Sequence, residues 1–449
     1  MTGPFKELVQ LAVPLVLAQL AQNTVSFVDT LMVGRLGESA LAGIALGSTT
    51  FHFVGIVFLG VILGVSPVVS QATGANDEET ASRAVRQSIW LGFILGIPAI
   101  ILFWNIEPFL IWLKQPEDTV QISGEYLRAI SFGMIPYLWI MGLRGYLEGK
   151  SNTRPIMTIL FAGVLLNILL NDALMFGRYG LPALGLVGTG YASATVYYIV
   201  FFVFSAYIVR KYPQSQLLQK IRTPDMPMLF ELVRVGGPIG LTLAFEGSMF
   251  TAAAFAMGTL GKTELAGHQI ALQTASVTFM IPLGFAIATT ILVGQAIGSG
   301  QPAKAKIAGR VGMFVCVGVM CFTATMLATF PKQVVSLYLD LEQAKNQPVT
   351  EFAASLLIIA AMFQIFDGLQ VASNAALRGL KDTTAAMIIT LFSYWGIGCT
   401  LGAWLCFYTR LSGPGLWYGM TTGLAAAAVL LTWRFEWKIQ NEIRRTSQG

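Results

Sequence analysis

The sequence predicts an all-α integral membrane protein with twelve transmembrane helices, arranged as two pseudo-symmetric six-helix bundles. Composition, the length of the apolar segments and an internal repeat predict this fold. Of the 449 residues, 55% are hydrophobic and 11% are charged, whereas soluble domains carry about 25% charged residues. So few charges cannot cover the surface of a water-soluble protein of this size, but a lipid-facing surface needs few.

Apolar segments of about 20 residues or more recur along the whole chain, and a helix of that length crosses the roughly 30 Å hydrocarbon layer. Helices are expected because they satisfy their own backbone hydrogen bonds where lipid offers no partner. The alternating pattern of membrane β-strands is absent from the sequence. In chain order, the spans are predicted at 8–33, 45–72, 87–112, 122–143, 155–177, 185–209, 232–257, 269–297, 308–330, 350–377, 384–408 and 413–433.

Basic residues are concentrated in alternate loops. Twelve spans place both termini on one side, and 20 of the 28 Lys and Arg residues fall on that side. Cytoplasmic loops carry the excess of Lys and Arg in membrane proteins. We therefore expect a multi-pass protein of the cell (inner or plasma) membrane with both termini in the cytoplasm. This pattern accounts for the formal net charge of +5, so no nucleic-acid partner is expected.

The two halves of the chain repeat each other. Residues 8–86 align with residues 232–310 without a gap at a constant offset of 224, and 20 of the 79 positions are identical. The matches include Pro14 with Pro238 and several turn glycines. Apolar composition raises the number of chance identities, but it does not bring turn glycines, a glutamine and an arginine into one register.

A later Leu-Arg-Gly motif at 143–145 recurs at 377–379, at an offset of 234. An even number of helices in each unit makes the repeat parallel, an arrangement suited to alternating access between two bundles. We predict an N-terminal lobe at 1–209, a cytoplasmic linker at 210–231 and a C-terminal lobe at 232–449.

Three carboxylates fall well inside predicted spans: Asp29, Glu246 and Asp367. A charged side chain at the bilayer centre costs at least about 2.5–3.5 kcal/mol on the insertion scale, so such residues usually face a cavity and have a function. The helical rise places Glu246 roughly 18 Å from either end of its span and Asp367 roughly 16 Å from the cytoplasmic end. Their counterparts in the other half are not acidic: Ala253 for Asp29, Gln22 for Glu246 and Gly133 for Asp367.

Two mid-membrane carboxylates in one lobe, with no Lys or Arg beside them in sequence, favour the binding of a cation. A buried carboxylate can carry a proton, and carboxylate and carbonyl oxygens can also coordinate Na⁺. Either ion would be driven inward by the membrane potential, worth about 2.3 kcal/mol per charge per 100 mV. The alternative interpretation is a structural carboxylate held by neighbouring Ser, Thr or Asn.

Together the repeat, the carboxylates and several motifs resemble the multidrug and toxic compound extrusion (MATE) family, over essentially the whole chain. The motifs are at residues 28–37 (Val-Asp-Thr-Leu-Met-Val-Gly-Arg-Leu-Gly), 266–271 (Ala-Gly-His-Gln-Ile-Ala), 293–298 (Val-Gly-Gln-Ala-Ile-Gly) and 377–379 (Leu-Arg-Gly). Asp29, Glu246 and Asp367 fall where the NorM-like branch carries its essential acidic residues. In that branch Glu246 and Asp367 would belong to the cation site of the C-terminal lobe, with a possible Na⁺ bound there.

The resemblance also extends to polar residues around these sites. Asn167 and Asn171 match the NorM-like pattern, whereas the DinF-like branch has Asp at the position of Asn171. Phe363 stands one turn before Asp367, where related proteins can carry Tyr. We interpret Asn167, Asn171, Gln269 and Phe363 as substrate-contacting or supporting residues. For the three amides the alternative is hydrogen bonding between helices, which is the more common role of such residues in membrane proteins.

The resemblance implies a cation-coupled antiporter that exports cationic amphiphilic drugs or other organic cations by alternating access. It favours Na⁺ over H⁺ as the coupling ion and implies no cofactor, membrane lipid as the surroundings and a monomer. A lipid-linked oligosaccharide flippase of the wider superfamily is the second hypothesis, although such proteins generally place basic residues in the central cavity. An intramembrane enzyme is a third, but there is no paired-His zinc motif and no Ser–His pair at useful spacing.

Overall fold

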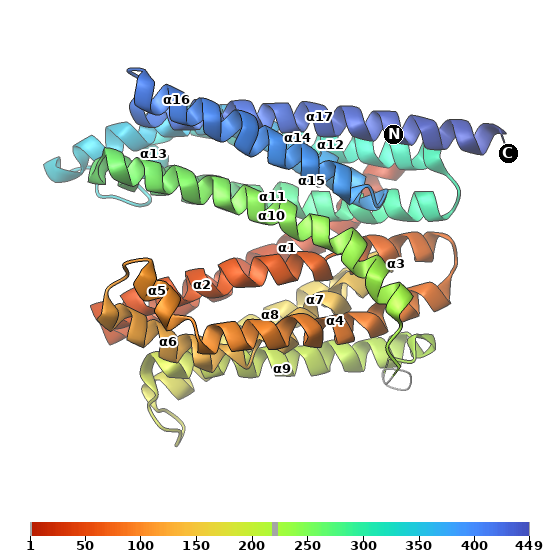
Figure 1. The fold of residues 1–449 in the computed structure, drawn as a ribbon, viewed down its shortest axis with the longest axis horizontal. Coiled ribbons are helices and arrows are strands. Elements are labelled where there is room, and N and C mark those ends of the chain that lie inside the picture. The colour runs from red at the N-terminus through yellow and green to blue at the C-terminus, as the bar shows by residue number, and fades with distance from the viewer. Residues whose placement is uncertain (1, 218–222, 449) are drawn as a thin grey trace. The chain divides into compact units, whose positions relative to one another are not determined.

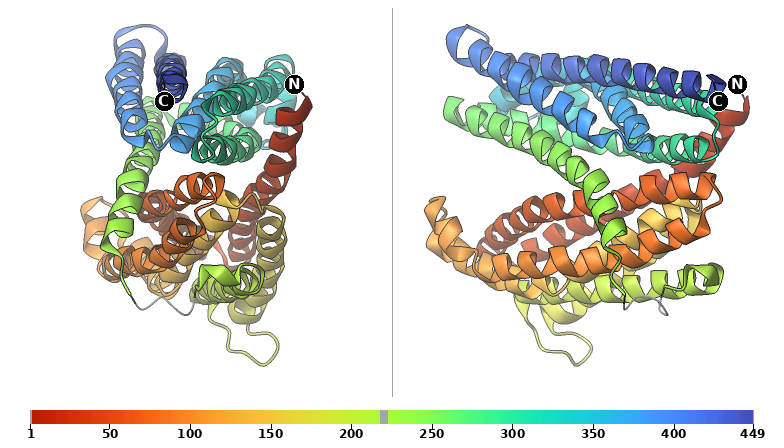
Figure 2. Two further views of the ribbon diagram at one scale, coloured as in Figure 1. Left: turned by 90° about the vertical axis from the view of Figure 1, so that its right-hand side faces the viewer. Right: turned by 45° about the vertical axis from the view of Figure 1, so that its right-hand side comes forward.

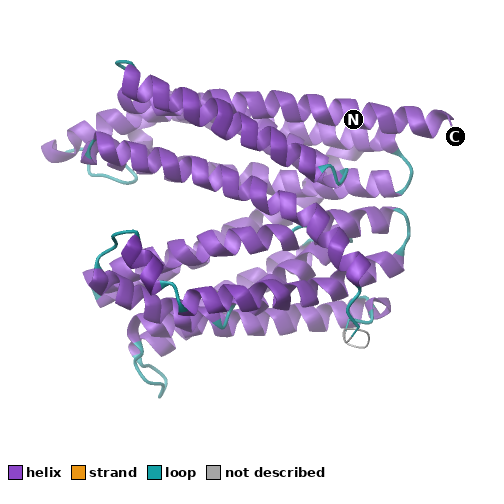
Figure 3. Ribbon diagram, in the orientation of Figure 1, coloured by secondary structure: helices purple, strands orange, loops and turns teal. Residues whose placement is uncertain are grey.

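The structure is a computed structural model that describes residues 2–217 and 223–448, so residues 218–222 of the predicted linker lie outside the described residues. Regular structure in these ranges is helical and contains no strand (Figures 1 and 3). The helices of the first half are α1 (Thr2–Val33), α2 (Glu38–Ile62), α3 (Val65–Gly74), α4 (Glu78–Trp104), α5 (Glu107–Trp112), α6 (Glu117–Ser131), α7 (Met134–Gly149), α8 (Arg154–Phe176) and α9 (Gly185–Lys211).

The second half has the corresponding series of long helices. They are α10 (Met226–Leu260), α11 (Lys262–Gly298), α12 (Pro302–Thr329), α13 (Pro331–Val335), α14 (Gln347–Gly379), α15 (Thr383–Leu391), α16 (Thr400–Tyr408) and α17 (Ser412–Gln448). Between α15 and α16 the helix continues as a π-helical stretch, η4 (Phe392–Cys399). Short 3₁₀ turns occur at η1 (Gly34–Leu36), η2 (Pro213–Ser215) and η3 (Ala344–Asn346).

The described residues contain 11 helical segments that are long and apolar enough to cross a membrane, or 12 when α6 and α7, bent by 50°, count as one span. This agrees with the predicted twelve spans and confirms the all-α membrane fold. The span predicted at 45–72 is divided into α2 and α3 by a break at Leu63 and Gly64.

The chain folds into two compact units, each a bundle of helices (Figures 1 and 2). The first contains residues 1–16 and 241–449, and the second contains residues 17–240. The sequence places the lobe boundary in the linker, whereas these boundaries fall inside α1 and α10. Position 240 is the repeat counterpart of position 16, so each half of the chain gives its equivalent first segment to the other unit.

The unit of residues 17–240 is organised around α7, which packs against α3, α4 and α9. Nearly every residue of α7 is buried, including the ionised pair Arg144 and Glu148. Arg144 donates from Nε to Glu148 (2.8 Å), from Nη1 to Gln22 (2.8 Å) and from Nη2 to Gln19 (2.7 Å). A buried charge pair is tolerated only when its remaining hydrogen-bonding groups are satisfied, and here three of these groups are.

The same unit includes the end of the linker, which is bound to α4 by an ion pair and a hydrogen bond. Arg83 bonds Asp225 at 2.5 Å, and Arg86 donates to the backbone carbonyl of Ser215 at 2.9 Å. The hydrogen bond from Arg83 holds the pKa of the Asp225 carboxyl below its usual value, because it stabilises the ionised form. These contacts fix the chain immediately before α10 begins.

Helix α10 meets α2 through glycines. A Cβ added at Gly60 would lie 2.0 Å from Cα of Gly240, and one at Gly236 would lie 1.9 Å from the carbonyl oxygen of Val61. Small residues allow membrane helices to approach backbone to backbone. The repeat reproduces the crossing in the other unit, where a Cβ at Gly284 would lie 2.4 Å from Cγ2 of Val16.

The other unit, residues 1–16 and 241–449, is organised around α14, which packs against α11, α12 and α17. Its core includes the fully buried side chains of Tyr394, Trp417 and Phe435. Because α14 corresponds to α6 and α7 in the repeat, both units place the same part of the repeat at their centre. This central helix carries Phe363 and Asp367 on one stretch and Arg378 near its end.

Candidate cation and substrate sites

Glu246 and Asp367, the two mid-membrane carboxylates predicted to act together, line a single cavity of about 190 Å³. Glu246 comes from α10 and Asp367 from α14, and α11 supplies Ser276 to the same wall. The rest of the lining is apolar: Phe250, Leu272, Ala275, Phe279, Met280 and Phe363. Asp367 is 7% exposed, and Glu246 is half-buried. An aromatic cavity with two carboxylates is suited to a cation.

The two carboxylates have no hydrogen bond or ion pair with any residue in the described part of the chain. The structural interpretation, in which neighbouring Ser, Thr or Asn hold them, is therefore not supported at this site. Unpaired carboxylates in a low-dielectric interior are costly unless they bind a proton or a cation. Their mutual electrostatic interaction adds to this cost.

A tyrosine on the π-helical stretch extends this site. The Tyr394 side chain is fully buried, its hydroxyl has no hydrogen-bond partner among the described residues, and it interacts electrostatically with both carboxylates. π-Helical insertions are frequent at functional sites. Phe363, at the position where related proteins can carry Tyr, packs edge-on against Phe250 and Trp417.

Asp29 lies in the other unit, in a polar network on α1, α8 and α9. Its Oδ1 accepts a hydrogen bond of 2.5 Å from Asn171, and its Oδ2 accepts a longer one of 3.4 Å from Ser193. Asn167 donates to Ser193 (3.2 Å) and accepts from Asn171 (3.1 Å). The structure thus brings together Asp29, Asn167, Asn171 and Ser193, and the carboxylate of Asp29 has the Asn and Ser partners that the structural interpretation describes.

We expect Asn171→Ala to destabilise the protein more than Ser193→Ala. Asn171 makes the short bond to Asp29, and leaving a buried acceptor without its donor costs about 1–3 kcal/mol. Ser193 donates a bond at the limit of hydrogen-bonding distance and accepts one of 3.2 Å from Asn167, so its loss should cost about 1 kcal/mol. Melting temperatures in one detergent measure the two variants; an equal or larger loss for Ser193→Ala would contradict this ranking.

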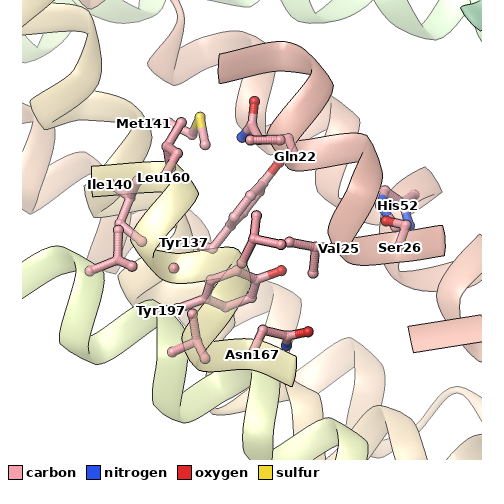
Figure 4. A pocket seen from close by; sticks show the side chains of 15 residues that line it. Gln22, Val25, Ser26, His52, Tyr137, Ile140, Met141, Leu160, Asn167 and Tyr197 are labelled. Carbon is pink, nitrogen blue, oxygen red and sulfur yellow. The ribbon is translucent and has the colours of Figure 1, made fainter. Parts of the chain in front are cut away.

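A cavity of about 110 Å³ lies beside this network (Figure 4). Its polar lining includes Gln22, His52, Tyr137, Asn167 and Tyr197. Asn167 is shared by the cavity and the hydrogen-bond network of Asp29, to which it is linked through Asn171 and Ser193.

The two cavities are related by the repeat. Gln22, Ser26 and His52 line the cavity beside Asp29, and their counterparts at the offset of 224 are Glu246, Phe250 and Ser276, which line the cavity of the carboxylate pair. The repeat has therefore produced one polar, uncharged cavity and one acidic, aromatic cavity from equivalent positions.

Gln269, predicted to support the substrate, lies apart from the carboxylates. It lines a third and more open cavity of about 610 Å³ that is otherwise mostly apolar and contains Phe255 and Leu265. Phe250 and Leu272 line both this cavity and that of the carboxylate pair, so the two are adjacent. His268, the neighbour of Gln269, is buried and accepts a hydrogen bond from Trp417.

Residue-by-residue inspection of the sequence missed Ser193, Ser276, Tyr394 and the position of Arg378. Arg378 interacts electrostatically with Glu246 although 132 positions separate them in the sequence. The signal was present in the repeat, because Arg378 is the counterpart of Arg144 and Glu246 the counterpart of Gln22. No signal in the local sequence distinguishes Tyr394 from other tyrosines near span centres.

Comparison with known proteins gives a consistent result. The family model described as MatE matches residues 14–171 and 238–404, two segments that begin at equivalent positions of the repeat. The "Probable multidrug resistance protein NorM" of Pseudomonas putida is 39% identical over 442 residues, covering 98% of this chain and 96% of that protein. The "Multidrug resistance protein NorM" of Burkholderia vietnamiensis is 38% identical over 439 residues, covering 97% and 94%.

Among solved structures, the outward-facing conformation of a multidrug resistance MATE family transporter of the MOP superfamily aligns with a TM-score of 0.89. The alignment covers 98% of this chain and 96% of that chain, at 21% sequence identity. At this identity the likeness establishes the fold.

Proposed function

Because the chain belongs to the MatE family, with NorM multidrug resistance proteins among its relatives, we propose that it exports cationic amphiphilic compounds in exchange for an inward-moving cation. A NorM-type multidrug efflux transporter takes small-molecule substrates and requires no enzymatic chemistry. The observation that carries the proposal is the pair Glu246 and Asp367, in one aromatic-lined cavity and without a hydrogen bond or ion pair to the described residues.

The coupling cation binds to Glu246 and Asp367 in this proposal, with the hydroxyls of Ser276 and Tyr394 as further ligands. Hard cations such as Na⁺ prefer oxygen ligands, and two carboxylates with two hydroxyls provide them. Na⁺ is favoured over H⁺ because of the NorM-like resemblance. Binding neutralises charge that the interior would otherwise hold unpaired, and this stabilisation is the free energy available to drive the exchange.

An organic cation would compete with the coupling ion for the same cavity. Phe250, Phe279 and Phe363 surround the carboxylates, and aromatic faces attract organic cations by about 0.5–2 kcal/mol each. The adjacent cavity of about 610 Å³, with Gln269 in its wall, provides room for a larger amphiphile. Mutually exclusive binding of drug and ion is sufficient to couple their movements in opposite directions.

The moving bodies in this proposal are the lobes at 1–209 and 232–449, joined by the linker at 210–231, and Asp29 is a second control point in the N-terminal lobe. Both termini face the cytoplasm, in keeping with the concentration of Lys and Arg on that side. The protein acts as a monomer in the inner membrane, surrounded by lipid. None of the residues that line the three cavities is Lys or Arg, which does not favour a flippase that holds pyrophosphate.

Efflux of ethidium from proteoliposomes tests the proposal. We expect an imposed inward Na⁺ gradient to accelerate efflux, because Na⁺ displaces the drug from the carboxylates. A pH gradient of the same driving force serves as the second arm and identifies a proton as the coupling ion if it alone accelerates efflux. If neither gradient changes the rate relative to protein-free vesicles, the antiport proposal is wrong.

A further inference from the structure

The strongest unexplained feature outside the carboxylate pair is a difference between two equivalent arginines. In the unit of residues 17–240, Arg144 is fully engaged: its Nε bonds Glu148 one turn later, and its Nη1 bonds Gln22. In the other unit, the counterpart of Arg144 is Arg378, the counterpart of Glu148 is Asp382 and the counterpart of Gln22 is Glu246. The repeat therefore predicts which groups should surround Arg378.

One of these expected partners, Asp382, is paired with a different arginine. Asp382 binds Arg434 through two hydrogen bonds of 2.8 and 3.3 Å. Correspondingly, Nε of Arg378, the atom equivalent to the one that bonds Glu148, is buried without a hydrogen-bond partner in the described ranges. A guanidinium is always charged and carries five N–H donors, so an unsatisfied, buried Nε is a costly arrangement that calls for a reason.

The other expected partner has gained a charge. Where Arg144 bonds the neutral amide of Gln22, the equivalent position in the other unit carries the carboxylate of Glu246, which interacts electrostatically with Arg378. The same replacement of Gln by Glu creates the acidic cavity. Two groups can therefore neutralise Glu246: a cation bound in its cavity and the guanidinium of Arg378.

We propose that Arg378 is the internal counter-ion of Glu246, pairing with this carboxylate when the coupling cation leaves, as Arg144 pairs with Gln22. The inference rests on the proposed function, because it assigns the site from which the cation must depart. A carboxylate abandoned in the membrane interior is strongly destabilised. Arg378 lowers that cost, so it weakens cation binding and speeds release. Because Asp382 is paired with Arg434, it does not hold the guanidinium of Arg378, which can move between the two states.

The test measures initial rates of ethidium efflux from proteoliposomes at increasing concentrations of the coupling cation. Wild-type protein first identifies which cation this is, in the same set of measurements. Arg378→Gln should lower the cation concentration for half-maximal rate about tenfold, since one opposing charge is removed, and should reduce the maximal rate because release is slowed. Arg378→Lys, which retains the charge, should remain within about threefold of the wild type in half-maximal concentration. A purely structural role for Arg378 would lower the maximal rate without tightening cation binding.

Two controls separate the local effect from a general one. Arg310→Gln removes an exposed arginine that pairs with Glu436 in the same unit and should leave the half-maximal concentration unchanged. In the Glu246→Gln background, which should itself lack ion-driven efflux, Arg378→Gln should not restore it. If Arg378→Gln fails to fold, Arg378→Met replaces it with the same expectation, because it also removes the charge.

The possible results separate the counter-ion role of Arg378 from the proposed antiport. A tighter half-maximal concentration with a lower maximal rate supports the counter-ion role. An unchanged or weaker half-maximal concentration in Arg378→Gln or Arg378→Met, with a coupled wild type, overturns this inference and leaves the proposed antiport intact. A wild type that responds to neither ion gradient overturns the proposed function and the inference together.

Discussion

Glu246→Gln is expected to abolish ion-driven efflux while leaving a folded protein. The substitution keeps the size of the side chain and removes the charge that would hold the cation, as Gln22 does at the equivalent position of the repeat. Removing one partner of a buried ion pair costs about 3–5 kcal/mol, so cation affinity should fall on the order of 100-fold or more. Initial rates of ethidium efflux under the driving gradient measure the effect.

Asp367→Asn should have a similar effect, because Asp367 lines the same cavity and also has no hydrogen bond or ion pair within the part of the chain that the structure describes. A matched control is Glu351→Gln, which makes the same chemical change at an exposed position of α14, the helix that carries Asp367. The control should transport like the wild type. Coupled export at the wild-type rate by both Glu246→Gln and Asp367→Asn would show that the cation binds elsewhere.

Asp367→Asn is not expected to destabilise the protein, which distinguishes its effect on transport from damage to the fold. Asp367 has no hydrogen bond or ion pair with the described residues, so its neutralisation removes an unfavourable interaction with Glu246. The melting temperature in detergent without the coupling ion should therefore be equal to or above that of the wild type. A large decrease would indicate that Asp367 holds the C-terminal lobe together.

Gly236→Ala is expected to be strongly destabilising, whereas Gly237→Ala is not. At Gly236 the added Cβ would lie 1.9 Å from the carbonyl oxygen of Val61 and 2.6 Å from its carbon, both backbone atoms that cannot rotate away. At Gly237 nothing lies within 4 Å of the added Cβ. The two variants differ by one position on the same helix and make the same chemical change.

Overpacking costs about 1–3 kcal/mol and occasionally more, and contact with rigid backbone places Gly236→Ala at the upper end, about 3 kcal/mol. Gly237→Ala should instead stabilise α10 by up to about 1 kcal/mol, because Ala favours the helix over Gly. Thermal unfolding in detergent and initial efflux rates compare the two. Equal melting temperatures for the two variants would mean that the first part of α10 does not pack tightly against α2.

The sequence was sufficient for the number and approximate position of the spans, because bilayer thickness imposes a length on every helix. The family resemblance, derived from motifs around Asp29, His268 and Arg378, is confirmed by the MatE match over both halves of the repeat. The internal offset of 224 further predicted which residues share equivalent positions. These features depend on local composition or on register, both of which are visible in one dimension.

Features that depend on tertiary contact were not predictable. The break between α2 and α3 lies at Gly64, where an added Cβ would lie 2.8 Å from the backbone of Gly236 and Leu232, and only the fold reveals that neighbour. The interaction of Tyr394 with carboxylates on α10 and α14 likewise becomes visible only in the folded structure. Asp382 pairs with Arg434 and not with Arg378, and this choice of partner depends on how the helices pack against one another.

Equilibrium binding of the coupling cation to the purified protein is the most direct measurement. Saturable binding is expected for the wild type and for Glu351→Gln, and its loss is expected when Glu246→Gln and Asp367→Asn are combined. A doubly substituted protein that binds the cation with wild-type affinity would contradict the assignment of the ion to these two carboxylates.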